Sequence, residues 1–155
     1  MGASMKTDVT KLNDTRVKQG LRTRALAIIQ ELEDAGYRVK ITEVIRTVER
    51  QRGLYAQGRT KAWLLSKGYS SAEIEKFRAQ GFTSTKAKVT SMMFPSFHGS
   101  GRAMDIVFTT NTGVLIWDGS YPGYAKYGEL CRKHGLKWGG GWKARDLCHA
   151  QWEGE

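Results

Sequence analysis

The chain has 155 residues, and its 25 Lys and Arg against 15 Asp and Glu give a formal net charge of +10. A chain of this length is expected to form one domain, which buries about two-thirds of the surface that its unfolded form exposes. Hydrophobic residues make up 40% and charged residues 26%, as in soluble globular proteins, and every apolar run is shorter than the roughly 20 residues of a membrane span. These values exclude a membrane-spanning protein.

The basic charge favours a polyanionic partner, with nucleic acid, anionic lipid and a cell-wall polymer as candidates. Solvated charges without such a partner are the alternative. Residues 1–8 do not contain the apolar core of a signal peptide, so we expect synthesis in the cytosol without an export signal. Cys131 and Cys148 are too few for a disulfide framework, and we expect two reduced thiols.

The first two predicted elements are a helix and a strand. Apolar residues at three- and four-residue steps predict an amphipathic helix over residues 14–35, with Asn13 or Asp14 as its cap. The alternation that follows predicts a strand over residues 38–45. The far end of this strand would deliver Arg46 to the edge of a sheet.

A basic helical region comes next. Residues 48–58 predict a short helix with Gln51 near its start. Residues 60–88 predict two further helical pieces, the second opened by a capping box from Ser70 to Glu73. Because this segment holds much of the excess positive charge, we interpret it as a basic insertion.

The second half of the chain predicts most of a sheet. Residues 103–108 and 114–117 predict strands, and Pro122 fits the first turn of a helix capped by Ser120. Residues 136–152 predict two strands around a glycine-rich loop. The whole pattern predicts a single α+β domain over residues 1–155, with helices on one side of a small, mostly antiparallel sheet.

One turn, "SFHGSGRAMD", suggests a metal site. If residues 103–108 form a strand, Asp105 projects to the face opposite Met104 and Ile106. A carboxylate among apolar neighbours is costly unless it is paired or binds a cation. The glycines between His98 and Asp105 allow a turn sharp enough to bring the two side chains together.

The end of the chain offers a third ligand. His149 completes a set of two imidazoles and one carboxylate, which leaves one tetrahedral position for water, as in catalytic zinc sites. Asp146, three residues earlier, could reach that water as general base and acid. The alternatives are a hydrogen-bonded turn histidine at His98 and an ordinary surface pair of Asp146 with His149. His134, in the last turn of a helix, is interpreted as complementing the helix dipole.

These motifs resemble a known family. Ser96-x-His98-x-x-Gly101-x-Ala103-x-Asp105 and Asp146-x-x-His149 resemble the zinc peptidases of the D-alanyl-D-alanine carboxypeptidase and dipeptidase group, the M15 or VanY-like family. The stretches "IRTVERQRGLYAQGRT", "KVTS" and "WGGGW" resemble its phage endolysin branch, the L-alanyl-D-glutamate peptidases. The resemblance runs from about residue 39 to residue 152 and is interrupted by the basic insertion.

The resemblance implies roles for particular residues. His98, Asp105 and His149 would bind one Zn²⁺, and Asp146 would be the catalytic acid and base. Arg46 matches the arginine that polarises the scissile carbonyl in relatives, with a structural salt bridge as the alternative role. Three further residues would position the substrate or brace the metal site, namely Gln51, Ser96 and Gln151.

The resemblance also implies a reaction and a setting. Zinc would lower the pKa of a bound water toward about 7, and Asp146 would move the proton from this water to the leaving amine. The substrate would be the stem peptide of peptidoglycan, with anionic cell-wall or outer-membrane polymers contacting the basic surface. We expect a monomer that is made in a host cytoplasm and reaches the wall through a holin-type pore, and no nucleic acid partner.

Three other functions remain open from the sequence. A D,D-carboxypeptidase or dipeptidase of the same family would release D-alanine instead. A nucleic-acid-binding module would use Trp63, Trp138 and Trp142 as stacking platforms. A cysteine peptidase would use Cys148, but its neighbour His149 would point to the opposite side of a strand.

Overall fold

The computed structural model describes residues 5–90 and 97–154. The described residues divide into two compact units, one from 1–45 together with 100–155 and one from 46–99. We call them the sheet unit and the helical unit and describe each by itself. In the described part of the chain, every helix is too short or too polar to cross a membrane.

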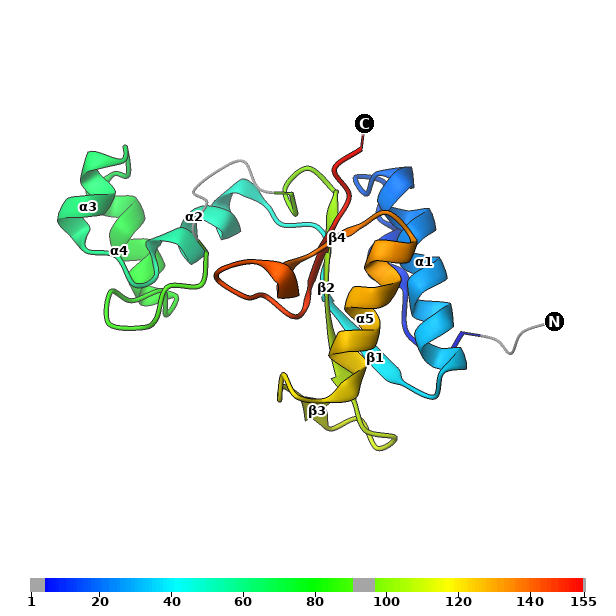
Figure 1. Cartoon of the computed structure of the whole chain (residues 1–155). Helices are drawn as coiled ribbons and strands as arrows, with labels where there is room; N and C mark the ends of the chain where they lie inside the picture. The colour runs from blue at the N-terminus through cyan, green and yellow to red at the C-terminus, as the bar shows by residue number, and fades with distance from the viewer. Residues whose placement is uncertain (1–4, 91–96, 155) are drawn as a thin grey trace. The chain divides into compact units, whose positions relative to one another are not determined.

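The sheet unit contains one antiparallel sheet, visible in Figure 1 as the arrows labelled β1 to β4. Its described strands are β1 (Arg38–Glu43), β2 (Ala103–Thr109), β3 (Leu115–Ile116), β4 (Lys137–Trp138) and β5 (His149–Gln151). The strand order is β1-β2-β5-β4, and β3 pairs with β2 outside this path. The predicted α+β class with a small antiparallel sheet is confirmed.

Helices cover one face of this sheet. The helical elements of the unit are η1 (Thr10–Asn13), α1 (Gln19–Asp34), α5 (Pro122–Lys133) and η2 (Gly139–Gly141). The helices α1 and α5 pack against each other, and their buried residues share a core with Met104, Ile106 and Phe108 of β2. Because side chains alternate along a strand, residues 103, 105 and 107 of β2 belong to the other face.

A β-bulge bends β1 beside this second face. Ile41 lies opposite Ile106 and Glu43 lies opposite Asp105, so Thr42 is the extra residue. A bulge re-aims the strand that contains it. The strand therefore ends at Glu43, two residues earlier than the sequence indicates.

Two predicted helix caps are wrong. The helix α1 begins at Gln19, after Lys18, and no side chain caps it. Asp14 instead accepts hydrogen bonds from the backbone and side chain of Arg16, which removes it from the helix end. Ser120 does not cap α5 either, because its backbone and hydroxyl groups both donate to Asp118.

Within its described residues, 46–90 and 97–99, the helical unit contains three short helices, α2 (Val48–Ala56), α3 (Lys61–Ser66) and α4 (Ser71–Ala79). A side-chain oxygen caps each of them, supplied by Thr47, Thr60 and Ser70. The predicted cap at Ser70 is confirmed, because its hydroxyl accepts from the Glu73 N–H at 3.1 Å. Three capped helices in succession explain how such short segments stay helical.

A small core holds the helical unit together. Its buried members are Tyr55, Ala56, Leu64, Tyr69, Ile74 and Phe77, with Phe82 packed beside them. Tyr55 and Ala56 come from α2, so the segment 60–88 shares its core with the helix that precedes it. The helices of this segment are therefore integrated with α2 by packing.

Candidate metal centre

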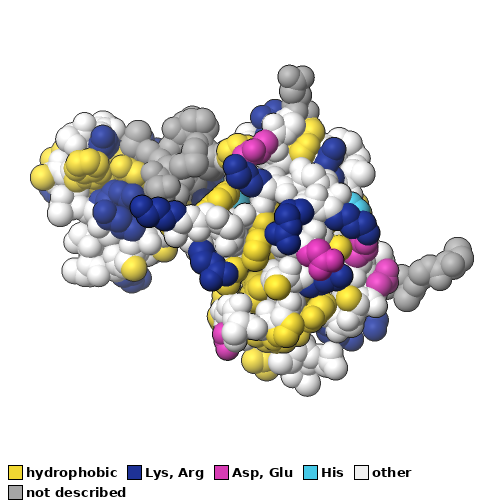
Figure 2. All heavy atoms as spheres, viewed as in Figure 1, with side chains coloured by type: hydrophobic (Ala, Val, Ile, Leu, Met, Phe, Trp, Pro, Cys, Tyr) yellow, Lys and Arg dark blue, Asp and Glu magenta, His cyan; other side chains and the backbone are white. Residues whose placement is uncertain are grey.

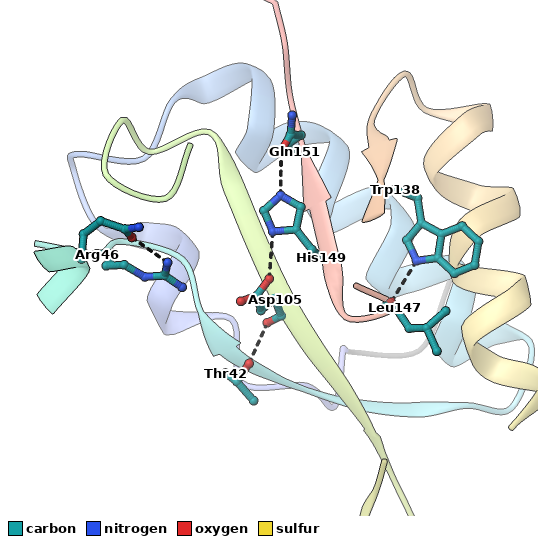
Figure 3. Close-up of polar contacts among 8 residues, drawn as sticks. Thr42, Arg46, Asp105, Trp138, Leu147, His149 and Gln151 are labelled. Carbon is teal, nitrogen blue, oxygen red and sulfur yellow. Dashed lines mark hydrogen bonds and ion pairs between the residues drawn. The ribbon is translucent and has the colours of Figure 1, made fainter. Parts of the chain in front are cut away.

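The pairing of β2 with β5 places two predicted ligands next to each other. Asp105 lies directly opposite His149 in the antiparallel register. Directly paired side chains point to the same face of a sheet. The His149 Nδ1 atom is 3.2 Å from the Asp105 Oδ1 atom, and His149 is buried. Figure 3 marks this contact with a dashed line.

Gln151 occupies the next position on the same face of β5. Ala150 between them points into the core, whereas the Gln151 Oε1 atom lies 2.7 Å from His149 Nε2 (Figure 3). Both ring nitrogens of His149 therefore have polar neighbours, which fix the plane of the ring. The indole of Trp142 packs on this ring with a centroid separation of 5.0 Å. Gln151 was predicted to brace the site, and its role stays a prediction.

His98 belongs to the same candidate group. The group of His98, Asp105 and His149 could hold a metal ion, because the ligand atoms that they offer all lie within 4.8 Å of one another. His98 is buried, with 4% of its surface exposed. Of the two glycines that follow it, Gly101 has φ +73°, and a Cβ there would lie 2.1 Å from the Arg16 carbonyl oxygen. Only glycine fits this turn.

The electrostatics of His149 show competition between burial and its neighbours. Burial lowers the pKa of the imidazole, but the hydrogen bond and charge of Asp105, together with Gln151 and Asp146, outweigh it, so the pKa is raised. An ionised carboxylate and a ring nitrogen that carries no hydrogen can only accept hydrogen bonds. Their 3.2 Å contact therefore needs a proton or a cation between them.

The donor chemistry fits zinc. Two imidazoles and one carboxylate are among the usual ligands of Zn²⁺. A ligating histidine normally gives its other ring N–H to an acceptor, and here Gln151 Oε1 stands at that nitrogen. The residues present therefore suit a divalent ion of this kind.

A glycine loop carries Asp146 to the start of β5. The Asp146 N–H donates to the Gly139 carbonyl at 2.9 Å, and a Cβ on Gly139 would lie 2.5 Å from the Asp146 carbonyl oxygen. A Cβ on Gly140 would lie 2.2 Å from the Trp138 ring. The loop thus needs glycine for close approach. Asp146 itself is exposed, and its charge contributes to the raised pKa of His149.

The helical unit holds the other predicted site residues. The Arg46 guanidinium donates to the Gln51 Oε1 atom at 2.7 Å, and the Gln51 amide donates to Thr90 Oγ1 at 3.2 Å. Gln51 is 1% exposed. Arg46 is therefore held by an amide. Thr90 belongs to the stretch "KVTS" but was given no role from the sequence, because a motif does not show which distant side chain a threonine contacts. Ser96 lies outside the described residues.

Other polar residues have separate structural positions. His134 ends α5 and pairs with Glu31 of α1. Cys131 and Cys148 are free thiols, as expected. Burial raises the pKa of Cys148 to about 11, which keeps it protonated at neutral pH and argues against a cysteine peptidase.

Comparisons with known proteins find similar peptidases. A family model described as D-alanyl-D-alanine carboxypeptidase, Peptidase_M15_4, matches residues 90–152. The chain is 28% identical over 139 residues to the peptidoglycan L-alanyl-D-glutamate endopeptidase CwlK of Bacillus subtilis, covering 84% of this chain and 70% of that protein.

A solved structure has the same fold. The L-Ala D-Glu endopeptidase ChiX of Serratia marcescens matches with a TM-score of 0.53 and 19% identity, over 96% of this chain and 91% of that one. The matched family segment contains His98, Asp105, Asp146 and His149. Together with the antiparallel sheet and the His-Asp-His group, these likenesses support a metallopeptidase of the M15 type.

Proposed function

We propose that the protein is a zinc-dependent peptidoglycan endopeptidase that hydrolyses the L-alanyl-D-glutamate bond of the stem peptide. The carrying observation is the β2 and β5 register, which sets Asp105 against His149 on the sheet face away from the helices. The names of two relatives, CwlK and ChiX, support this bond as the target.

In this proposal His98, Asp105 and His149 hold one zinc ion. When bound, the ion supplies an acidified water and a positive charge that polarises the scissile carbonyl. The chain's own contribution is to fix the ligands, since Asp105 and His149 are anchored on paired strands and Gln151 holds the ring of His149.

Asp146 is proposed as the group that accepts a proton from the attacking water and returns it to the leaving amine. Its place supports this role, because the backbone of the glycine loop holds it three residues before His149 while its side chain stays exposed. Arg46 is proposed to stabilise the oxyanion, an effect worth a few kcal/mol. Gln51 keeps its guanidinium oriented through the 2.7 Å hydrogen bond.

A D,D-carboxypeptidase of the same family is the second candidate. It is favoured by the description of the family model, which names D-alanyl-D-alanine carboxypeptidase. The two candidates share the metal site and differ in the bond they cleave. Products therefore separate them, whereas metal content does not.

The test combines zinc content with digestion of purified muropeptides. We expect about one zinc per chain and fragments cut between L-alanine and D-glutamate. His149→Ala should lose both zinc and cleavage, while the matched control His134→Ala, outside the site, should keep both. Release of free D-alanine would instead establish the second candidate. Cleavage that survives in zinc-free protein would reject the metal mechanism.

We also propose a bacteriolytic role of the phage endolysin type, supported by the resemblance of the stretches around Arg46, Lys88 and Trp138 to that branch. The protein would act from the cytoplasm once a pore opens the membrane. Cells that express it should lyse only after the membrane is permeabilised. Lysis without permeabilisation would contradict this role.

A further inference from the structure

Three side chains at alternate positions form a chain of contacts at the end of β5. The Gln151 Nε2 amide donates to Glu153 Oε2 at 2.9 Å. The Gln151 Oε1 atom in turn lies 2.7 Å from His149 Nε2, and His149 Nδ1 lies 3.2 Å from Asp105 Oδ1. Gln151 is 6% exposed, so water competes little for its amide.

The chemistry of these groups fixes the hydrogens between Glu153, Gln151 and His149 Nε2. The carboxylate of Glu153 only accepts hydrogen bonds, so the amide nitrogen of Gln151 must face it. The amide oxygen then faces His149 and requires a hydrogen on Nε2. In the neutral ring this leaves the lone pair on Nδ1, on the side of Asp105.

We propose that Glu153 is a positioning residue, which sets the orientation of the Gln151 amide and thereby the tautomer of His149 that can bind a metal. The proposal rests on the proposed function only in the identity of the ion. If the amide were reversed, its NH₂ would face Nε2 and demand a lone pair there. The ring hydrogen would move to Nδ1, which blocks coordination from that atom.

The ion pair of Glu153 with Lys137 does not explain why the Glu153 carboxylate faces the Gln151 amide. Lys137 Nζ lies 3.9 Å from Glu153 Oε2, but both side chains are at least half exposed, so this pair contributes little. The directional contact of Glu153 is the one to Gln151.

The first test measures zinc affinity of the full chain by competition with a chromophoric chelator. Partners that orient a metal ligand typically change affinity by 10- to 100-fold, so Glu153→Ala should weaken zinc binding by about 10-fold. Glu129→Ala, which removes an exposed glutamate on α5, should leave it unchanged. Equal affinity of Glu153→Ala and the native chain would overturn the proposal.

A second test, in the Gln151→Glu variant, distinguishes an effect of Glu153 on the orientation of the Gln151 amide from a general effect on the structure. In Gln151→Glu the carboxylate has two equivalent oxygens, so nothing has to orient it. Adding Glu153→Ala to this variant should cost no affinity, and removing the repulsion between the two carboxylates should even improve it. A loss of the same size in both backgrounds would show a merely structural role and would reject the proposal.

The tautomer can also be read without any metal. In zinc-free protein, at a pH where the ring is neutral, Asp105 favours hydrogen on Nδ1 and Gln151 favours hydrogen on Nε2. ¹⁵N shifts of the imidazole should therefore report a larger share of hydrogen on Nε2 in the native chain than in Glu153→Ala. Unchanged shifts would refute the inference. This measurement stays decisive if the protein proves to bind another metal or to lack peptidase activity, so the two failures are distinguishable.

Discussion

The sheet unit and the helical unit are built differently. Among the described residues, the core of the sheet unit contains 19 buried residues and that of the helical unit contains six. Residues 46–99 nevertheless carry ten Lys and Arg against three Asp and Glu, which is +7 of the chain's +10. The unit with the smaller core therefore carries most of the charge.

Arginine side chains explain in part how a unit with a small core can carry so much positive charge. The Arg52 guanidinium lies 3.9 Å from the Tyr69 ring centroid, and Arg59 lies 3.8 Å from that of Tyr55. Arg78 donates to the backbone carbonyls of Ala56 and Phe82. Cation–π contacts and charged hydrogen bonds thus supplement a core that has few apolar side chains.

The rest of the positive charge of the helical unit comes from lysines. Lys61, Lys67, Lys86 and Lys88 are exposed, and Figure 2 shows dark blue side chains gathered beside hydrophobic ones over the helical unit. The exposed hydrophobic residues there include Trp63 and Leu65. The comparison teaches that positive charge in one small unit can be placed in two ways, with arginines packed against its core and lysines exposed on its surface.

The largest expected effect concerns the small core. Phe77→Ala should destabilise the helical unit by about 3–5 kcal/mol, because it removes a side chain that is 1% exposed and leaves a cavity. Hydrogen exchange should then speed up across α2 to α4 while the amides of the sheet unit stay protected. Leu32→Ala, in the larger core, is the matched variant and should show the reverse pattern. Simultaneous loss of protection in both units would contradict two separate cores.

The exposed lysines should decide attachment to the cell wall. Changing Lys61, Lys67, Lys86 and Lys88 to Gln should weaken binding to intact walls roughly tenfold at low salt and less at high salt. Cleavage of soluble muropeptides should be unaffected. The control changes four exposed lysines of the sheet unit, namely Lys6, Lys11, Lys18 and Lys40. Equal losses in both sets would mean that net charge alone matters.

Acid should weaken the Arg52–Glu73 pair. The hydrogen bond with Arg52 lowers the pKa of Glu73 below its ordinary value. A lowered pKa gives stability that is present above the unfolded pKa of about 4.5 and is lost as the pH falls through the folded value. Glu73→Gln should therefore cost about 1 kcal/mol near neutral pH and nothing in strong acid. Denaturant unfolding at several pH values checks this, and a difference that persists in acid would contradict the pair's role.

The smallest effect concerns a buried hydroxyl in the sheet unit. Within the described part of the chain, the Tyr127 hydroxyl has no hydrogen-bond partner, and burial raises its pKa well above the ordinary value. A buried polar group without a partner is unfavourable, so Tyr127→Phe should raise the free energy of unfolding by up to about 1 kcal/mol. A marked loss of stability would reveal a partner such as a bound water.

Much of the fold could be predicted because its signals are local. The apolar stretch AMDIVF predicted β2 within one residue, and the Ser70 cap was recognised from its own tetrapeptide. The two wrong caps, at Asp14 and Ser120, had suitable residue types, but Asp14 accepts from Arg16 and Ser120 donates to Asp118 instead. Residue type alone does not say which of several nearby groups a side chain will bind.

The candidate site, like the fold, has features that the sequence could predict and features that it could not. Sequence spacing singled out Asp105 and His149, which lie 44 residues apart, but could not give their direct pairing or the contact of Gln51 with Thr90. By itself the sequence determined the residue types, the periodicities and the family motif. Only the tertiary structure decided the strand register, the bulge at Thr42 and the orientation of Gln151. The physical reason is that these features depend on contacts between segments far apart in the chain, and no local pattern encodes which hydrogen-bond partners will meet.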